Sequence, residues 1–328
     1  MNKQNRTMDK SLRIVYMGTP EFAVEALQRL VEGGYNVVGV ITTPDKPVGR
    51  GHHVQYSAVK EYALSNNLPL LQPERLKDES FIEALRAWKA DLQIVVAFRM
   101  LPEIVWNMPK YGTFNLHASL LPQYRGAAPI NWAIINGDVE TGITTFFLDK
   151  QIDTGQIIQQ VRIPIAETDN VGIVHDKLMV LGGDLVIETV NNIINKTVKP
   201  ISQEDVKVEG ELRPAPKIFK ETCRIDWTQS TERIYNLIRG LSPYPAAWSE
   251  LSSPDGEKNI LKIYESRKTT EKNFSEQPGT VKTDGKHYFR IATGDGYIDI
   301  LQLQLPGRKR MTVEEFLRGH NITDYLFE

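Results

Sequence analysis

Residues 91–98, DLQIVVAF, form the stretch that decides the predicted fold class. After Asp91 only Gln93 interrupts the apolar run, and a run this continuous predicts a strand covered on both faces. Strands of that kind lie at the centre of parallel sheets whose faces are packed with helices. We therefore expect residues 91–98 at the centre of an α/β domain.

The flanking sequence, from Arg13 to about Lys196, alternates short apolar runs with segments of helical period. This alternation is typical of βα units around a mostly parallel, doubly wound, Rossmann-like sheet. Other strands are expected at 13–18, 36–43 and 112–119, followed by a strand pair at 141–149 and 155–165. Helices are expected at 20–34, 56–67, 80–90, 129–137 and 171–196.

The remaining third of the chain has a different pattern. Residues 201–212 are polar, acidic and without periodicity, which predicts a linker. Beyond them come a helix, several short strands with Asp-Gly turns and a terminal helix, which favour a small β-barrel of the OB type. We predict a catalytic domain at 1–200, a linker at 201–212 and a barrel domain at 213–328.

Composition limits the class of protein. A chain of 328 residues with 41% hydrophobic and 24% charged residues matches a two-domain globular protein. A net charge of −2 excludes a globally basic nucleic-acid binder, although a local basic face remains open. Cys223 is the only cysteine, so an intramolecular disulfide and a thiolate metal cluster are excluded. No apolar run approaches the length of a membrane span, and we expect a cytoplasmic protein without membrane contact.

The strand at 112–119 ends in polar residues that predict a site. Asn115 and His117 point to the same face, because alternate side chains of a strand share a face. An amide and an imidazole together suit a carbonyl oxygen that becomes an oxyanion. Asp149 and Asp153 follow a neighbouring strand, and a carboxylate there would orient His117 or accept a proton. Without a Ser or Cys nucleophile, these groups favour transfer between two bound substrates.

Structural roles remain open for each of these residues. His117 would cap the sheet, Asn115 would satisfy loop amides, and Asp153, before Thr154-Gly155, would form an Asx-turn. The basic segment PDKPVGRGHHV, residues 44–54, would be a solvated surface turn.

Several motifs in one order carry a resemblance to a known family. NLHASLLPQYRGAAPI, residues 115–130, together with IDTG, residues 152–155, resembles the active-site motifs of the folate-dependent formyltransferases. GTPEFAVEAL, residues 18–27, the segment around 44–54, and CRIDW and IRGLSPYPAAW in the second domain extend the match from about Arg13 to about Thr312. These segments are similar to the branch whose members formylate methionine carried by initiator tRNA. At Phe98-Arg99-Met100 the chain departs from the family's Tyr-Gly-x-Ile-Leu-Pro pattern.

The resemblance implies an activity and its participants. A formyl group would pass from 10-formyltetrahydrofolate, as co-substrate, to the α-amino group of methionine on initiator tRNA. Asn115, His117 and Asp153 match the catalytic trio, with Asn115 and His117 stabilising the oxyanion and Asp153 holding His117 and taking the amine proton. We expect no metal, no nicotinamide and no flavin, and we expect a monomer.

Two further groups of residues are assigned by the same resemblance. The folate site is predicted to include Ser119, Leu120, Leu121, Pro122, Val95, Ala97 and Phe98. The tRNA is predicted to contact Lys46, Gly49, Arg50, Gly51, His52 and Arg125, with Arg50 matching the key arginine of the basic segment.

Three rival hypotheses are set against this one. A nicotinamide dehydrogenase would need three glycines where YMGTPEF, residues 16–22, has one, and an acidic residue closing the second strand, whereas Asp45 lies in the loop. A formyltransferase for a nucleotide sugar or glycinamide ribonucleotide would not need the basic segment and the barrel. A non-catalytic tRNA-binding module leaves the Asn115, His117 and Asp153 trio unexplained.

Overall fold

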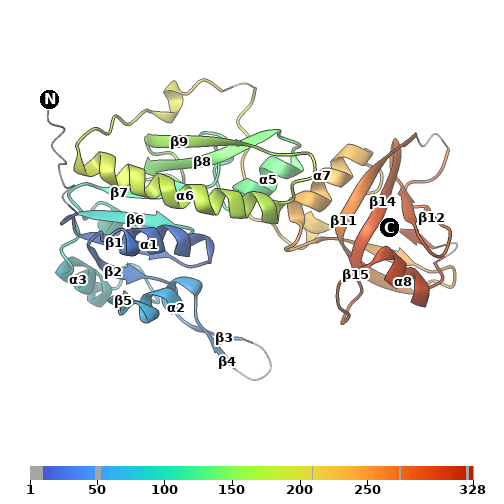
Figure 1. Cartoon of the computed structure of the whole chain (residues 1–328), viewed down its shortest axis with the longest axis horizontal. Coiled ribbons are helices and arrows are strands. Elements are labelled where there is room, and N and C mark those ends of the chain that lie inside the picture. The colour runs from blue at the N-terminus through green and yellow to red at the C-terminus, as the bar shows by residue number, and fades with distance from the viewer. Residues whose placement is uncertain (1–9, 49–52, 209, 273–274, 323–324, 328) are drawn as a thin grey trace, which may run out of the picture. The chain divides into compact units, whose positions relative to one another are not determined.

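The structure is a computed structural model that describes residues 10–48, 53–208, 210–272, 275–322 and 325–327. The chain divides into two compact units, each with its own sheet (Figure 1). The first unit comprises Met1–Gly126, Gly142–Ile163 and His175–Pro214, and the second comprises Ala127–Thr141, Pro164–Val174 and Ala215–Glu328.

The sheet of the first unit has the strand order β5-β2-β1-β6-β7-β8-β9. Its strands are β1 (Ile14–Gly18), β2 (Val37–Ile41), β5 (Leu70–Leu71), β6 (Leu92–Val96), β7 (Thr113–His117), β8 (Glu140–Phe147) and β9 (Ile157–Pro164). β6 is buried along its whole length and pairs in parallel with β1 and with β7. The mostly parallel α/β sheet with a central strand from 91–98 is thus confirmed.

Helices cover both faces of this sheet. They are α1 (Phe22–Glu32), α2 (Ala58–Ser65), α3 (Glu79–Ala87), α4 (Glu103–Trp106) and α6 (Val171–Ile194). α6 lies against β7 and β8, where a Cβ added at Gly182 would come within 2.8 Å of Leu116 and Ile143. α3 packs on the other face, in a core with Val95. Because side chains alternate along β7, Asn115 and His117 lie on the face opposite to α6.

The direction of β8 differs from the simple expectation that neighbouring strands end together. β8 runs antiparallel to β7, and its last residue Phe147 pairs with Phe114 near the start of β7. The loop after β8 therefore begins at the edge of the sheet away from His117. It must fold back over the sheet face to bring Asp153 to the ring.

The basic segment contains a hairpin where the sequence predicted only a loop. β3 (Lys46–Val48) and β4 (His53–Gln55) pair in antiparallel fashion. Asp45, just before β3, accepts hydrogen bonds from Lys60 of α2 at 2.5 Å and from Gln72 at 2.8 Å. The Lys60 ammonium, followed by Gln72, lowers the pKa of this carboxyl, so the base of the hairpin is tied to α2 by a charged pair.

The second unit holds a small barrel-like sheet and the helices α5 (Pro129–Ile135), α7 (Thr231–Leu241) and α8 (Val313–Gly319). The sheet has the order β12-β13-β14-β11-β10-β16, with β15 beside β14. Its strands are β10 (Ala247–Ser252), β11 (Lys258–Lys272), β12 (Val281–Thr283), β13 (Phe289–Ala292), β14 (Gly296–Gln304), β15 (Met311–Thr312) and β16 (Leu326–Phe327). A bridge between Thr280 and Leu326 joins the two edges. The expected OB-like barrel is confirmed.

The helices of this unit close its core. α7 (Thr231–Leu241) packs against α5 (Pro129–Ile135), and Asn131 donates to the carbonyl of Gly240 at 2.8 Å. α8 (Val313–Gly319) starts with a capping box of Thr312 and Glu315. No helix in the described ranges is both long and apolar enough to cross a membrane.

The units cross the predicted domain boundaries in two places. Residues 127–141 and 164–174 belong to the second unit, in which α5 packs on α7 through Asn131 and Ile135. The predicted linker belongs to the first unit and is not free. Ile201 pairs with Ile157 of β9, and residues Gln203–Asp205 form a 3-10 turn.

Candidate active site

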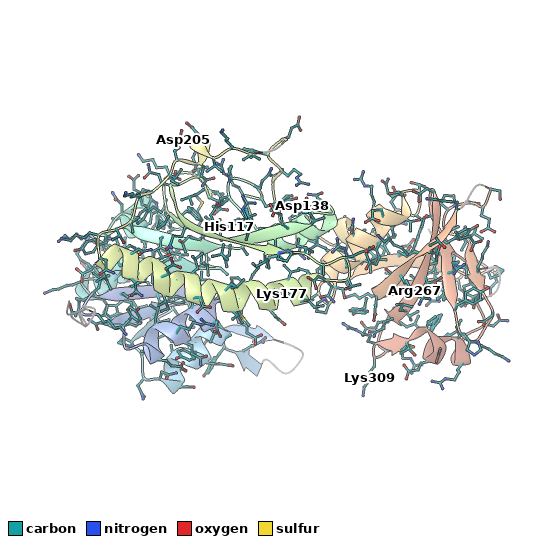
Figure 2. The ribbon with its side chains drawn as sticks, turned by 45° about the horizontal axis from the view of Figure 1, so that its top comes forward. His117, Asp138, Lys177, Asp205, Arg267 and Lys309 are labelled. Atoms are coloured by element: carbon teal, nitrogen blue, oxygen red, sulfur yellow. The ribbon has the colours of Figure 1, made fainter. Side chains whose placement is uncertain are left out.

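His117 is the last residue of β7 and is almost fully buried, with a side chain 7% exposed. Figure 2 shows it inside the first unit, on the side of the sheet toward the segment that carries Asp205. Its Nε2 lies 2.8 Å from the carbonyl oxygen of Tyr124. Because a carbonyl oxygen only accepts, Nε2 carries the hydrogen and the lone pair of the neutral ring is on Nδ1.

Asp153 lies on the Nδ1 side of this ring. Its Oδ2 is 3.8 Å from Nδ1 and accepts a hydrogen bond from the backbone N–H of Gly126 at 2.9 Å. Asp153 has φ of 56°, in the left-handed region that non-glycine residues rarely adopt. The carboxylate beside the buried imidazole thus belongs to a loop residue with a strained backbone conformation.

Asn115 completes the group on the same face of β7. It pairs in register with Val95 of β6 and Phe146 of β8. Its side chain is partly exposed and has no hydrogen-bond partner within the ranges that the structure describes. The amide is therefore available to a bound molecule.

The other candidate groups of this region have structural partners. Asp149 is exposed and closes its own loop, accepting from Gln151 N at 2.9 Å and Thr154 Oγ1 at 2.7 Å. Ser119 is buried and donates to the carbonyl of Gln123. Cys223 lies in the core of the other unit, where burial raises the pKa of its thiol. None of these hydroxyl or thiol groups is presented as a nucleophile.

The predicted folate loop is held by β8 and β9. Thr144 donates to the carbonyl of Ser119 at 2.6 Å and accepts from Leu121 N at 3.3 Å. Gln160 donates to the carbonyl of Leu121 at 2.8 Å. Leu120 is partly buried and lies over Gly142, and Pro122 is buried. These bonds hold the loop backbone, and the carbonyls of Ser119 and Leu121 already accept hydrogen bonds within the protein.

The other residues predicted to contact the folate, Val95, Ala97 and Phe98, lie in β6 or directly after it. Val95 is in the sheet core, and Phe98 is partly buried beside the Arg99 guanidinium. Ala97 is exposed with φ of 46°. Met100 is also exposed, so apolar surface is available at the carboxyl end of β6. Such a surface fits one face of a flat heteroaromatic ring system.

The predicted tRNA-binding residues are only partly described. Gly49, Arg50, Gly51 and His52 lie outside the described residues, and Lys46 begins β3. Arg125 is partly buried, and both its Nε and its Nη2 donate to Gln203, at 3.0 and 2.7 Å.

Sequence reasoning missed three residues that shape the site: Tyr124, Gly126 and Gln203. Tyr124 is buried with φ of 60°, and its carbonyl sets the tautomer of His117. Gly126 has φ of 126° and offers its N–H to Asp153. The Arg-Gly pair in the sequence could have indicated a turn at Gly126. Gln203 lies in a segment without periodicity, so no pattern in the sequence pointed to it.

The described ranges contain no cluster of three His, Cys, Asp or Glu side chains with the geometry of a metal site.

Two family models match the chain, one over its N-terminal part and one over its C-terminal part. Residues 12–190 match the family model described as "Formyl transferase", and residues 217–321 match "Formyl transferase, C-terminal domain". A methionyl-tRNA formyltransferase of Bacteroides thetaiotaomicron is 71% identical over 96% of this chain and 98% of its own length. A Bacteroides fragilis protein of the same name is also 71% identical, over 96% of this chain and 97% of its own.

A solved structure is similar in fold. The sugar 3N-formyl transferase WlaRD, solved with dTDP and 5-N-formyl-THF, superimposes with a TM-score of 0.64 at 21% identity. The match covers 91% of this chain and 99% of that one. Two family models spanning most of the sequence, and identities of this size over nearly its full length, show that the chain belongs to the formyl transferase family.

Proposed function

We propose that this protein transfers a formyl group from 10-formyltetrahydrofolate to the α-amino group of methionine esterified to initiator tRNA. The supporting observation is 71% identity to a methionyl-tRNA formyltransferase over almost the whole length of both chains. The geometry of the site agrees with this chemistry. Within the described ranges, an amide without a hydrogen-bond partner lies on the same strand face as a buried imidazole that has a carboxylate beside it, and Ser119 and Cys223 have structural roles.

Asn115 is proposed to stabilise the oxyanion. When the amine attacks the formyl carbon, the C=O bond opens and negative charge develops on oxygen. The Asn115 amide can donate to that oxygen, since it makes no hydrogen bond within the described part of the chain. A donor already in place stabilises the transition state without reorganisation.

His117 is proposed to accept and then donate the proton. Attack leaves a positive charge on the amine nitrogen, and the Nδ1 lone pair of the neutral ring accepts one proton from it. Asp153, 3.8 Å from Nδ1, stabilises the imidazolium that forms. The same proton then passes to the departing folate nitrogen as its bond to carbon breaks and the C=O bond re-forms. Because Nε2 is committed to Tyr124, a neutral His117 does not donate to the oxyanion, which refines the role expected from the sequence.

The substrates would meet at the face of β7 that carries Asn115. We assign the folate to the loop Ser119–Pro122 and to the exposed surface after β6, at Ala97 and Phe98. The acceptor end of the tRNA would contact the segment of β3 and β4, including Arg50. We further propose that the protein is cytoplasmic, monomeric and without membrane contact. Light scattering of the purified protein would measure its mass and so test whether it is a monomer.

The experiment that tests the function is a formyl-transfer assay with 10-formyltetrahydrofolate and four acceptors in parallel. These are charged initiator tRNA, charged elongator tRNA, free methionine and an amino-sugar nucleotide. We expect transfer to charged initiator tRNA to have the highest kcat/KM. Preference for the amino-sugar nucleotide would replace the proposed acceptor, and absence of transfer to all four would reject the activity.

A further inference from the structure

We propose that Gln203 is a positioning residue for this reaction. It holds the Asp153 carboxylate at the correct position beside His117. The inference rests on the proposed function. It concerns a residue in the segment after α6, far in sequence from β7 and from the loop after β8.

The Gln203 amide is buried, 5% exposed, and every hydrogen-bonding position it has is used. Its Oε1 accepts from Nε and Nη2 of Arg125, at 3.0 and 2.7 Å. Its Nε2 donates to the carbonyls of Asp153 and Gly155, both at 2.8 Å. One side chain thus joins the loop after β7 to the loop after β8.

These two loops supply both partners of one hydrogen bond in the site. Arg125 is followed directly by Gly126, whose N–H donates to Asp153 Oδ2. Gln203 therefore clamps the residue before the donor and the residue that carries the acceptor. Fixing both sides sets where the carboxylate lies relative to His117 Nδ1.

The backbone conformation of Asp153 explains why the hydrogen bonds from Gln203 are needed. A non-glycine residue at φ of 56° persists only where its surroundings hold it, and the Asp153 carbonyl is held by Gln203. Without the clamp the loop can relax toward more populated angles. A carboxylate displaced by about 1 Å supports proton transfer much less well, and such misplacement typically costs about a hundredfold in rate.

The segment that carries Gln203 has other anchors. Ile201 pairs with Ile157 in both directions at 2.9 Å, and Gln123 bridges Glu211 O and Arg213 N at 3.0 and 2.8 Å. Removal of the Gln203 amide should therefore leave the segment in place. This separates positioning of Asp153 from attachment of the segment.

The test compares three variants of the full-length protein. Gln203→Met removes both sets of hydrogen bonds, and Gln203→Glu keeps the acceptor for Arg125 but loses both donors to the Asp153 loop. Gln123→Met removes a bridging amide of the same type that does not contact Asp153. We expect both Gln203 variants to lower kcat by about 10- to 100-fold, with KM values within about threefold, and the Gln123 variant to stay within about threefold.

A double-mutant cycle decides how Gln203 acts. If it works through Asp153, Gln203→Met should have almost no further effect on kcat in the Asp153→Asn background. A full additional loss in that background would overturn the proposal, as would wild-type kcat in Gln203→Met.

Hydrogen exchange gives a readout that does not depend on activity. Amides of residues 148–156 should exchange faster in Gln203→Met than in wild type, while those of β7 stay unchanged. Equal exchange in that loop would also overturn the proposal. If the wild-type protein transfers no formyl group but the loop exchange rises, the proposed function fails and the clamp remains.

Discussion

At the scale of single residues, the site depends on what each polar side chain is left free to do. The Tyr124 carbonyl occupies one nitrogen of His117, so only the other can exchange a proton with a substrate. The ring centroids of His117 and Phe146 lie 6.4 Å apart with an angle of 88° between the ring planes, an edge-to-face arrangement that favours this orientation of the imidazole. Asn115 is left without a protein partner in the described ranges, so its partly exposed amide is free to donate a hydrogen bond to a bound molecule.

Asp153→Asn tests the charge that supports His117. The amide is isosteric but cannot stabilise the imidazolium, so we expect kcat to fall by about two to four orders of magnitude with little change in tRNA affinity. Steady-state kinetics and filter binding would measure the two effects. Asp149→Asn is the matched control on the same loop, because an amide oxygen still accepts from Gln151 and Thr154. Near-normal turnover in Asp153→Asn would remove this residue from the mechanism.

At the scale of elements, the loop between β8 and β9 has to reverse direction in little space. Its tightest point is Gly155, where an added Cβ would lie 1.7 Å from the carbonyl oxygen of Phe147. A backbone atom cannot move aside as a side chain can. Glycine is therefore required there by close approach of two backbone segments.

Gly155→Ala should displace this loop and with it Asp153. We expect kcat to fall at least tenfold, because the loop must move by more than an ångström to relieve the clash, and we expect a lower thermal midpoint. Kinetics and a thermal melt would measure both. Gly319→Ala, at the end of α8, places the new methyl in open space among the described residues outside the helix and should change neither. Unchanged kinetics in Gly155→Ala would show that the loop conformation does not matter.

At the scale of the whole molecule, the charge is nearly balanced, with a net charge of −2. Attraction of a polyanionic tRNA must therefore come from local basic surface and not from the net field. The segment around Arg50 is the local surface predicted from the sequence. The barrel adds basic side chains such as Lys309 (Figure 2), although acidic side chains accompany others, as in the pairs of Lys282 with Glu276 and Arg290 with Asp299.

Arg50→Ala should weaken use of charged tRNA without changing the chemistry. Loss of one phosphate contact raises the tRNA KM and reduces the slope of log affinity against log salt by about one. Kinetics from low to moderate salt would measure the slope, with the folate KM as an internal reference. Arg86→Ala, an exposed arginine on α3, controls for loss of charge as such. An unchanged salt slope in Arg50→Ala would contradict the assignment.

The features of this protein that follow from local chemistry can be predicted from the amino-acid sequence. The apolar run at 91–98 identified the central strand, alternation placed Asn115 and His117 on one face, and the short strands after 213 identified the barrel. Periodicity and hydrophobicity are local properties, so they can be read without coordinates.

Only the tertiary structure decided how distant segments meet. The sequence paired Asp153 with His117 by assuming that neighbouring strands end together, whereas β8 runs antiparallel and its loop folds back to make the contact. The Gln203 amide reaches the site from a segment with no local pattern that indicates it. A hydrogen bond between residues 50 positions apart depends on the path of the whole chain, and local propensities do not encode that path.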